Sequence, residues 1–168
     1  MYFNVLIAAI FALLVDSTLA CNGYKAKIKK LESCNPDNVV KVDDGFSVKL
    51  SKKCEIIPSG CISTKGFSTA KATYSLEKDG ITIKEGTVDL CEAAHEVSSE
   101  AKNLMKVFAI PDHCPVAEGK ICANENTKAD ISKYKHMMGV ARGNIVVSAK
   151  IKHDTGETCF KMEIEISK

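Results

Sequence analysis

The sequence has no tryptophan, only four prolines and no Asn-x-Ser/Thr sequon. The missing sequon excludes N-linked glycosylation. The prolines are scattered and no repeat or low-complexity run occurs, so we predict a single domain after the leader described below. The net charge is only +2, with the basic residues spread along most segments. Nucleic-acid binding needs a clustered basic face, so we expect no nucleic-acid partner.

Catalytic and metal-binding motifs are also missing. The chain contains no G-x-S-x-G, no H-E-x-x-H and no glycine-rich phosphate loop. It has no C-x-x-C, and its four histidines do not fall at zinc-finger spacing. We therefore predict that the protein is not an enzyme and needs neither a metal nor another cofactor. A secreted hydrolase is the enzymatic alternative, although no nucleophile motif supports it.

Only the first twenty residues carry a long apolar run. Residues 5–15 are VLIAAIFALLV, and the small residues Thr18 and Ala20 stand just before Cys21. This arrangement is typical of a secretory signal peptide cleaved after Ala20, and the run is short for a membrane anchor, which is the alternative. We predict a signal peptide at 1–20, a mature domain at 21–168, and a secreted, extracellular protein, with the lysosome as a second location.

All eight cysteines lie in the predicted mature chain. An even number in a secreted protein predicts four disulfides. The stretch HCPVAEGKIC, residues 113–122, resembles a thiol or metal pair at first sight, but a disulfide-bonded Cys114 has no thiolate for His113 to activate. We predict that Cys114 and Cys122 bond to different partners and that Glu118-Gly119 forms a turn between them.

Apolar and polar residues alternate with a two-residue period along most of the mature chain, as in half-buried strands. The clearest runs, 144–152 and 160–166, flank the turn HDTGE and predict a C-terminal hairpin. Further candidate strands are residues 25–31, 45–50, 70–76, 81–90 and 106–110. Residues 92–105 instead have apolar positions three to four apart, which predicts one short amphipathic helix. The pattern favours an all-β, antiparallel sandwich of about seven strands.

The order of these features resembles the ML lipid-recognition family, which includes the ganglioside activator, the Niemann–Pick cholesterol-transfer protein and the group 2 mite allergens. A leader and a first-strand cysteine are followed by CEIIPSGC, then CPVAEG, and finally NIVVSAKIKHDTGETCFKMEIEI. The resemblance covers nearly the whole mature chain and is most specific from Cys114 onward. It implies an immunoglobulin-like β-sandwich whose sheets separate to hold a lipid.

The resemblance also implies a disulfide pattern. It maps the long-range bridge of the family onto Cys34–Cys159 and the bridge of its Cys-Pro cysteine onto Cys91–Cys114. The closely spaced pair would be Cys54–Cys61, which leaves Cys21–Cys122 without a counterpart in the family.

We therefore expect a secreted lipid carrier that holds a sterol, fatty acid or glycolipid between its sheets, as a monomer with transient membrane or receptor contact. Small inner residues such as Ala72 and Ala149 would leave the sandwich underfilled. Paired methionines suit an adaptable surface, although they could equally close the end of the core. The alternative is a ligand-free sandwich that recognises other proteins in immunity or growth signalling. The expected ligand-binding residues are Val48, Leu50, Ala72, Tyr74, Phe108, Ile110, Met137, Met138, Val147, Ala149, Phe160, Met162 and Ile164.

Overall fold

The computed structural model describes residues 21–168 except 100–101, 104, 106–111 and 124–125. The predicted leader therefore lies outside the described residues. So do the candidate strand at 106–110 and two expected ligand-binding residues within it, Phe108 and Ile110.

The larger sheet has five antiparallel strands in the order β1-β10-β9-β5-β6. These strands are β1 (Lys25–Ser33), β5 (Ala70–Lys78), β6 (Ile81–Asp89), β9 (Gly143–His153) and β10 (Gly156–Ser167). The predicted C-terminal hairpin is confirmed, because β9 pairs with β10 from the His153–Gly156 turn to Gly143–Ile166. Gly156 has a φ of 144°, a conformation that side chains rarely adopt, which explains the glycine in this turn.

The second sheet is built around β4 (Glu55–Thr64). On one side β4 pairs with β2 (Val40–Val42) and β3 (Ser47–Leu50), and on the other with β7 (Gly119–Ala123) and β8 (Ala129–Asp130). Apart from β3, the alternation pattern did not predict these strands, because β4 contains a proline and a glycine and its partners are short. The described residues thus form ten strands instead of about seven, in the antiparallel, disulfide-stapled sandwich that was predicted.

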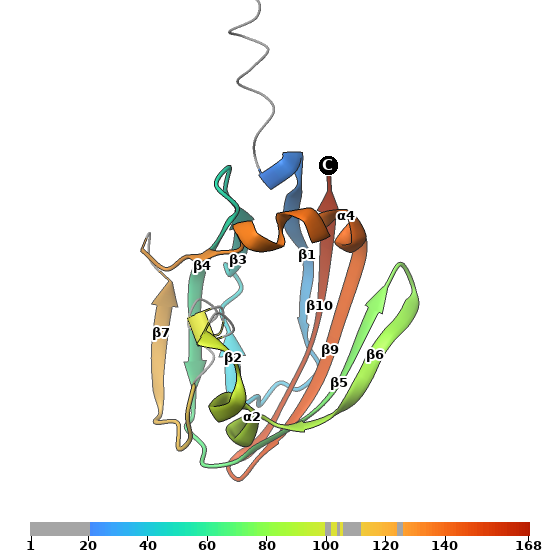
Figure 1. Cartoon of the computed structure of the whole chain (residues 1–168). Coiled ribbons are helices and arrows are strands. Elements are labelled where there is room, and N and C mark those ends of the chain that lie inside the picture. Colours follow the sequence, from blue (N-terminus) through green and yellow to red (C-terminus); the bar gives the residue numbers. More distant parts are fainter. Residues whose placement is uncertain (1–20, 100–101, 104, 106–111, 124–125) are drawn as a thin grey trace, which may run out of the picture.

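The helices are short. α2 (Leu90–Glu96) begins where the Asp89 carboxylate accepts hydrogen bonds from the backbone N–H groups of Cys91 and Glu92. The single helix predicted for 92–105 is wrong in extent, because the backbone becomes extended at Val97 (ψ 149°) before a few helical residues follow. The 3₁₀ helices η1 (Cys21–Gly23) and η2 (Ser132–Met137) and the helix α4 (Met138–Ala141) lie together at the end of the sandwich that carries the C-terminus (Figure 1).

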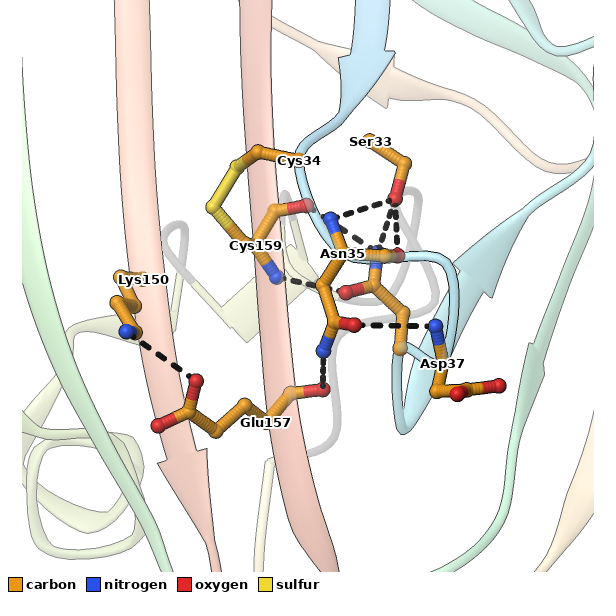
Figure 2. The surroundings of a disulfide bond; sticks show 8 residues. Ser33, Cys34, Asn35, Asp37, Lys150, Glu157 and Cys159 are labelled. Carbon is orange, nitrogen blue, oxygen red and sulfur yellow. Dashed lines mark hydrogen bonds and ion pairs between the residues drawn. A yellow bond between two sulfur atoms is a disulfide. The ribbon is translucent and has the colours of Figure 1, made fainter.

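Two of the implied disulfides, Cys34–Cys159 and Cys91–Cys114, are confirmed. Figure 2 shows how the segment after Cys34 is attached to β10. Cys34 donates its backbone N–H to the Cys159 carbonyl, and the buried Asn38 side chain binds both backbone groups of Cys159 at 2.8 and 3.2 Å. Hydrogen bonds thus surround the disulfide and take the place of strand pairing between this segment and β10.

The other two pairings, Cys54–Cys61 and Cys21–Cys122, are wrong. Cys54 stands just before β4 and Cys61 lies inside it, and seven residues of extended chain span about 23 Å. A disulfide needs Cα atoms about 4.4–6.8 Å apart, so these two cysteines cannot meet. Cys61 instead bonds to Cys122, its register partner on β7, and Cys54 bonds to Cys21 in η1. The prediction that Cys114 and Cys122 have different partners is confirmed.

Candidate functional site

The inner face of the five-stranded sheet can be followed through its register. Ala70 and Ala72 are buried, and Ala70 packs against Val39 and Phe67 from outside this sheet. Residues that are directly opposite on neighbouring strands point to the same side. The pairs that begin at Ala72 therefore define an inner face of apolar residues, comprising Ala72, Tyr74, Leu76, Ile145, Val147, Ala149, Ile151, Phe160, Met162 and Ile164.

Most of these inner residues are only partly buried. Ala72 is enclosed, but Tyr74, Val147, Ala149 and Phe160 all keep intermediate exposure. In a filled sandwich the inward side chains interdigitate and lose nearly all contact with solvent. The middle of the inner face therefore keeps apolar surface that the described residues do not fully cover.

Two packed clusters lie at the two ends of this inner face. At the C-terminal end, Met138 packs with the Cys21–Cys54 disulfide, and Leu50 and Ile166 bring the two sheets together there. The opposite cluster contains the buried residues Val39, Phe67 and Ala70, with partly buried Val40, Leu90, Cys91, Cys114, Val116 and Ile151 around them. The apolar stretch between the two clusters is the candidate ligand site.

The structure brings most of the expected ligand-binding residues to this stretch. Ala72, Tyr74, Val147, Ala149, Phe160, Met162 and Ile164 share the inner face of the larger sheet. Val48 and Leu50 occupy one face of β3, and Leu50 contacts the C-terminal cluster. Leu76, Ile145 and Ile151 were missed, although the same two-residue alternation could have identified them.

The two methionines of η2 and α4 are separated. Met138 is buried in the C-terminal cluster, so it closes the end of the core. Met137 is 53% exposed and lies on the outside of the same end. The two methionines therefore do not face one common site, which they would need to do if both lined the same ligand.

Ala149 occupies the centre of the candidate site. Its register partners are Tyr74 on β5 and Phe160 on β10. The Tyr74 hydroxyl leans toward β6, because a Cβ atom at Gly86 would lie 3.4 Å from it. Two aromatic side chains thus flank a small residue at the centre of the inner face.

His153 lies on the same face near the cluster of Val39 and Phe67. Its Nε2 is 3.0 Å from the Thr158 hydroxyl and its ring is 4.3 Å from that of Phe67. Its Nδ1 is buried with no hydrogen-bond partner among the described residues. Burial lowers the pKa of His153, so this end of the site favours a neutral imidazole.

A hollow of about 990 Å³ lies across the larger sheet and includes Tyr74, Ala149 and Phe160 in its lining. The lining residues come from both faces of the sheet. Two complete rows of register partners point to the face opposite Ala149. One row contains Thr73 and Lys150, and the other contains Ser75 and Lys161. This groove is therefore on the outer surface of the sandwich.

The described residues contain no group of three or more His, Cys, Asp or Glu side chains placed to hold a metal ion. Within the same residues, no helix is both long and apolar enough to cross a bilayer.

Together, the two sheets and the four disulfides define a disulfide-stapled β-sandwich, and four disulfides are typical of extracellular proteins. The sporozoite-associated mosquito saliva protein 1 of Anopheles gambiae is 34% identical over 152 residues, which cover 88% of this chain and 84% of that protein. The chain belongs to the family of this saliva protein.

No family model matches the chain. Among solved structures, chicken MD-1 complexed with lipid IVa aligns with 80% of this chain and 86% of its own, at 13% identity and a TM-score of 0.33. This likeness is too weak to support a conclusion about fold or ligand.

Proposed function

We propose that the protein is a secreted carrier that holds one apolar lipid between its two sheets. The observation that supports this function is the partly exposed apolar inner face around Ala149, which lies between two packed ends. A folded protein that leaves such a surface unfilled gains free energy when a lipid covers it. The resemblance of the sequence to the ML family points to the same class of ligand.

The size of the apolar face is adequate for useful affinity. A sterol-sized ligand that hides about 300 Å² of apolar surface gains roughly 7 kcal/mol at 25 cal/mol/Å². Loss of ligand freedom opposes that gain, whereas contacts with Tyr74 and Phe160 add to it. A micromolar dissociation constant, equivalent to about 8 kcal/mol, is within reach of these opposing contributions.

The role of the protein residues in this function is to enclose and release the ligand without covalent chemistry. The C-terminal cluster and the cluster around Phe67 hold the sheets at fixed separation, while the middle of each inner face contacts the lipid. We expect the mature chain to begin at Cys21 after removal of the leader, and sterols, fatty acids and glycolipids to be the ligand classes to compare.

The experiment is to purify the protein from the medium of secreting cells and to record native and denaturing mass spectra. The denaturing mass should equal that of residues 21–168 with four disulfides, and the native spectrum should show an added lipid mass. Stripped protein should then bind a fluorescent sterol or fatty acid. Failure to retain any lipid, together with failure to bind either probe, would reject the carrier function.

Recognition of another protein or a cell surface is the second candidate. It is favoured by the description of the relative as sporozoite-associated and by the groove on the outer sheet face. For this function the inner space would be irrelevant. Surface binding that persists in stripped protein, but is lost when Thr73 and Lys150 in the groove are replaced, would support it.

A further inference from the structure

Large apolar side chains are exposed on η2 and α4. Tyr134, Met137 and Val140 are 43%, 53% and 77% exposed. Residues three apart lie on one face of a 3₁₀ helix and remain close to it in an α-helix, so the three side chains form a stripe. Met138, one position after Met137, points the other way into the core. The short helical segment is thus fixed by one face and presents an apolar stripe on the other.

Large apolar side chains are also exposed beside the turn between β5 and β6. Asp79 in that turn donates its N–H to the Asn144 carbonyl at 2.8 Å and accepts the Asn144 N–H at 2.8 Å. These bonds hold the turn against the chain that leaves α4. Ile81 and Ile83, just beyond the turn, are 69% and 57% exposed. The tip of the hairpin and the stripe therefore belong to the same end of the sandwich (Figure 1).

The same end is basic. η2 and the residue after α4 supply the exposed cations Lys133, Lys135 and Arg142, and the sequence from 131 to 143 has no acidic residue. Lys52 is adjacent, because its carbonyl accepts the Cys21 N–H. Lys168 also lies here, with its Nζ 5.8 Å from the ring centre of Tyr24.

The nearby carboxylates are already engaged. Asp79 pairs with Lys78 at 2.6 Å, and Asp130 accepts the Ser132 N–H at 2.7 Å. Favourable partners hold the pKa of both carboxyl groups below the usual value, so both are ionised at neutral pH. Glu55, opposite Asp130 on β4, pairs with Lys128 at 2.7 Å. These three carboxylates offset part of the positive charge, but among the described residues the five cations Lys133, Lys135, Arg142, Lys52 and Lys168 outnumber them.

We propose that this end, defined by the stripe Tyr134–Met137–Val140, the isoleucines Ile81 and Ile83 and the surrounding cations, docks on a lipid bilayer that contains anionic lipid. Exposed apolar side chains enter the boundary between headgroups and acyl chains, while lysine and arginine attract negative headgroups. A sulfated glycan would use the cations alone and would leave the five apolar side chains without a role. The inference deepens the proposed carrier function, because docking would bring a lipid source or acceptor next to the sandwich.

The test is sedimentation of the mature protein with vesicles of 70% phosphatidylcholine and 30% phosphatidylserine. An intact mass that excludes residues 1–20 ensures that the apolar leader does not cause binding. We expect the protein to bind the mixed vesicles and to bind pure phosphatidylcholine vesicles much more weakly. Binding to the mixed vesicles should fall as the salt concentration rises, because salt screens exposed charges. Equal binding to both vesicle types would overturn the electrostatic part of the proposal.

Matched variants separate charge from apolar contact. K133Q/K135Q/R142Q should weaken binding on the order of 100-fold, at about fivefold per cation. K41Q/K71Q/K152Q removes three exposed lysines from other strands and should bind like the parent protein. V140S/I81S should also weaken binding, unlike I121S, which removes an apolar residue of comparable exposure from β7.

Retention of a fluorescent sterol or fatty acid is measured on the same samples. A protein that holds its ligand but does not sediment with either vesicle type would refute docking and leave the carrier function intact. A protein that sediments as expected but holds no ligand would refute the carrier function alone. Heparin binding without vesicle binding would show that the basic end recognises sulfated glycans instead.

Discussion

Filling the candidate site from the inside distinguishes a hollow sandwich from a packed one. Ala149 lies between Tyr74 and Phe160 on the inner face and is only partly buried. Replacing it by phenylalanine places a ring where the ligand would lie. The neighbouring Ser148 provides a matched control, because Ser148→Phe adds the same ring to the opposite face of the same strand.

The expected effect on stability depends on whether the space exists. In a filled core, extra bulk costs about 1–3 kcal/mol through strain. In a hollow site, the new ring covers apolar surface and should change the free energy of unfolding by less than about 1 kcal/mol. Affinity should respond more strongly, because a ligand that loses contact for about four methylene groups loses roughly 3 kcal/mol, equivalent to about a hundredfold.

Two measurements on A149F and S148F complete this experiment. Urea unfolding gives stability, and displacement of a fluorescent fatty acid or sterol gives affinity. We expect A149F to fold as stably as the parent protein and to bind far more weakly, whereas S148F binds normally. A loss of 2 kcal/mol or more in A149F alone, or unchanged affinity, would refute the reasoning.

The remaining predictions concern stability. Because burial depresses the pKa of His153 below 6.5, the unfolded chain binds a proton more readily than the folded one. Urea midpoints should therefore fall as pH drops from 6.5 toward 5, and His153→Gln should flatten that change; a parallel decline in the variant would contradict it. The bridges Cys34–Cys159 and Cys91–Cys114 join residues 125 and 23 positions apart, so the chain-entropy model assigns them about 5 and about 3.4 kcal/mol. Replacing the first pair by alanine should cost about 1.5 kcal/mol more than replacing the second, and equal losses in urea unfolding would contradict the entropic explanation.

The larger sheet was predictable because its strands alternate cleanly. In β10, for example, Phe160, Met162 and Ile164 alternate along the chain with charged residues that point to the other face. Each strand of this sheet is long enough to show the pattern. Most strands of the second sheet could not be predicted from the sequence. Its central strand contains Pro58 and Gly60, and Gly60 packs so closely on Phe46 that an added Cβ would lie 2.8 Å from the Phe46 Cα. A residue selected for close backbone approach carries no alternation signal.

The candidate site was partly predictable for the same reason. Alternation placed Tyr74, Val147, Ala149 and Phe160 on one side of their strands, and the register confirms that they share a face. It could not separate Met137 from Met138, because only packing on the Cys21–Cys54 bridge shows which side of the short helix faces the core.

The amino-acid sequence by itself determined which side of each long strand is apolar, since side chains alternate across a strand whatever surrounds it. It also provided eight cysteines that can all be paired. Only the tertiary structure decided that Cys61 meets Cys122 and that Cys54 meets Cys21, because a disulfide depends on which Cα atoms the fold brings close together. Likewise, only the tertiary structure decided that Met138 is buried while Met137 is exposed, because packing on the Cys21–Cys54 bridge selects one side of the short helix.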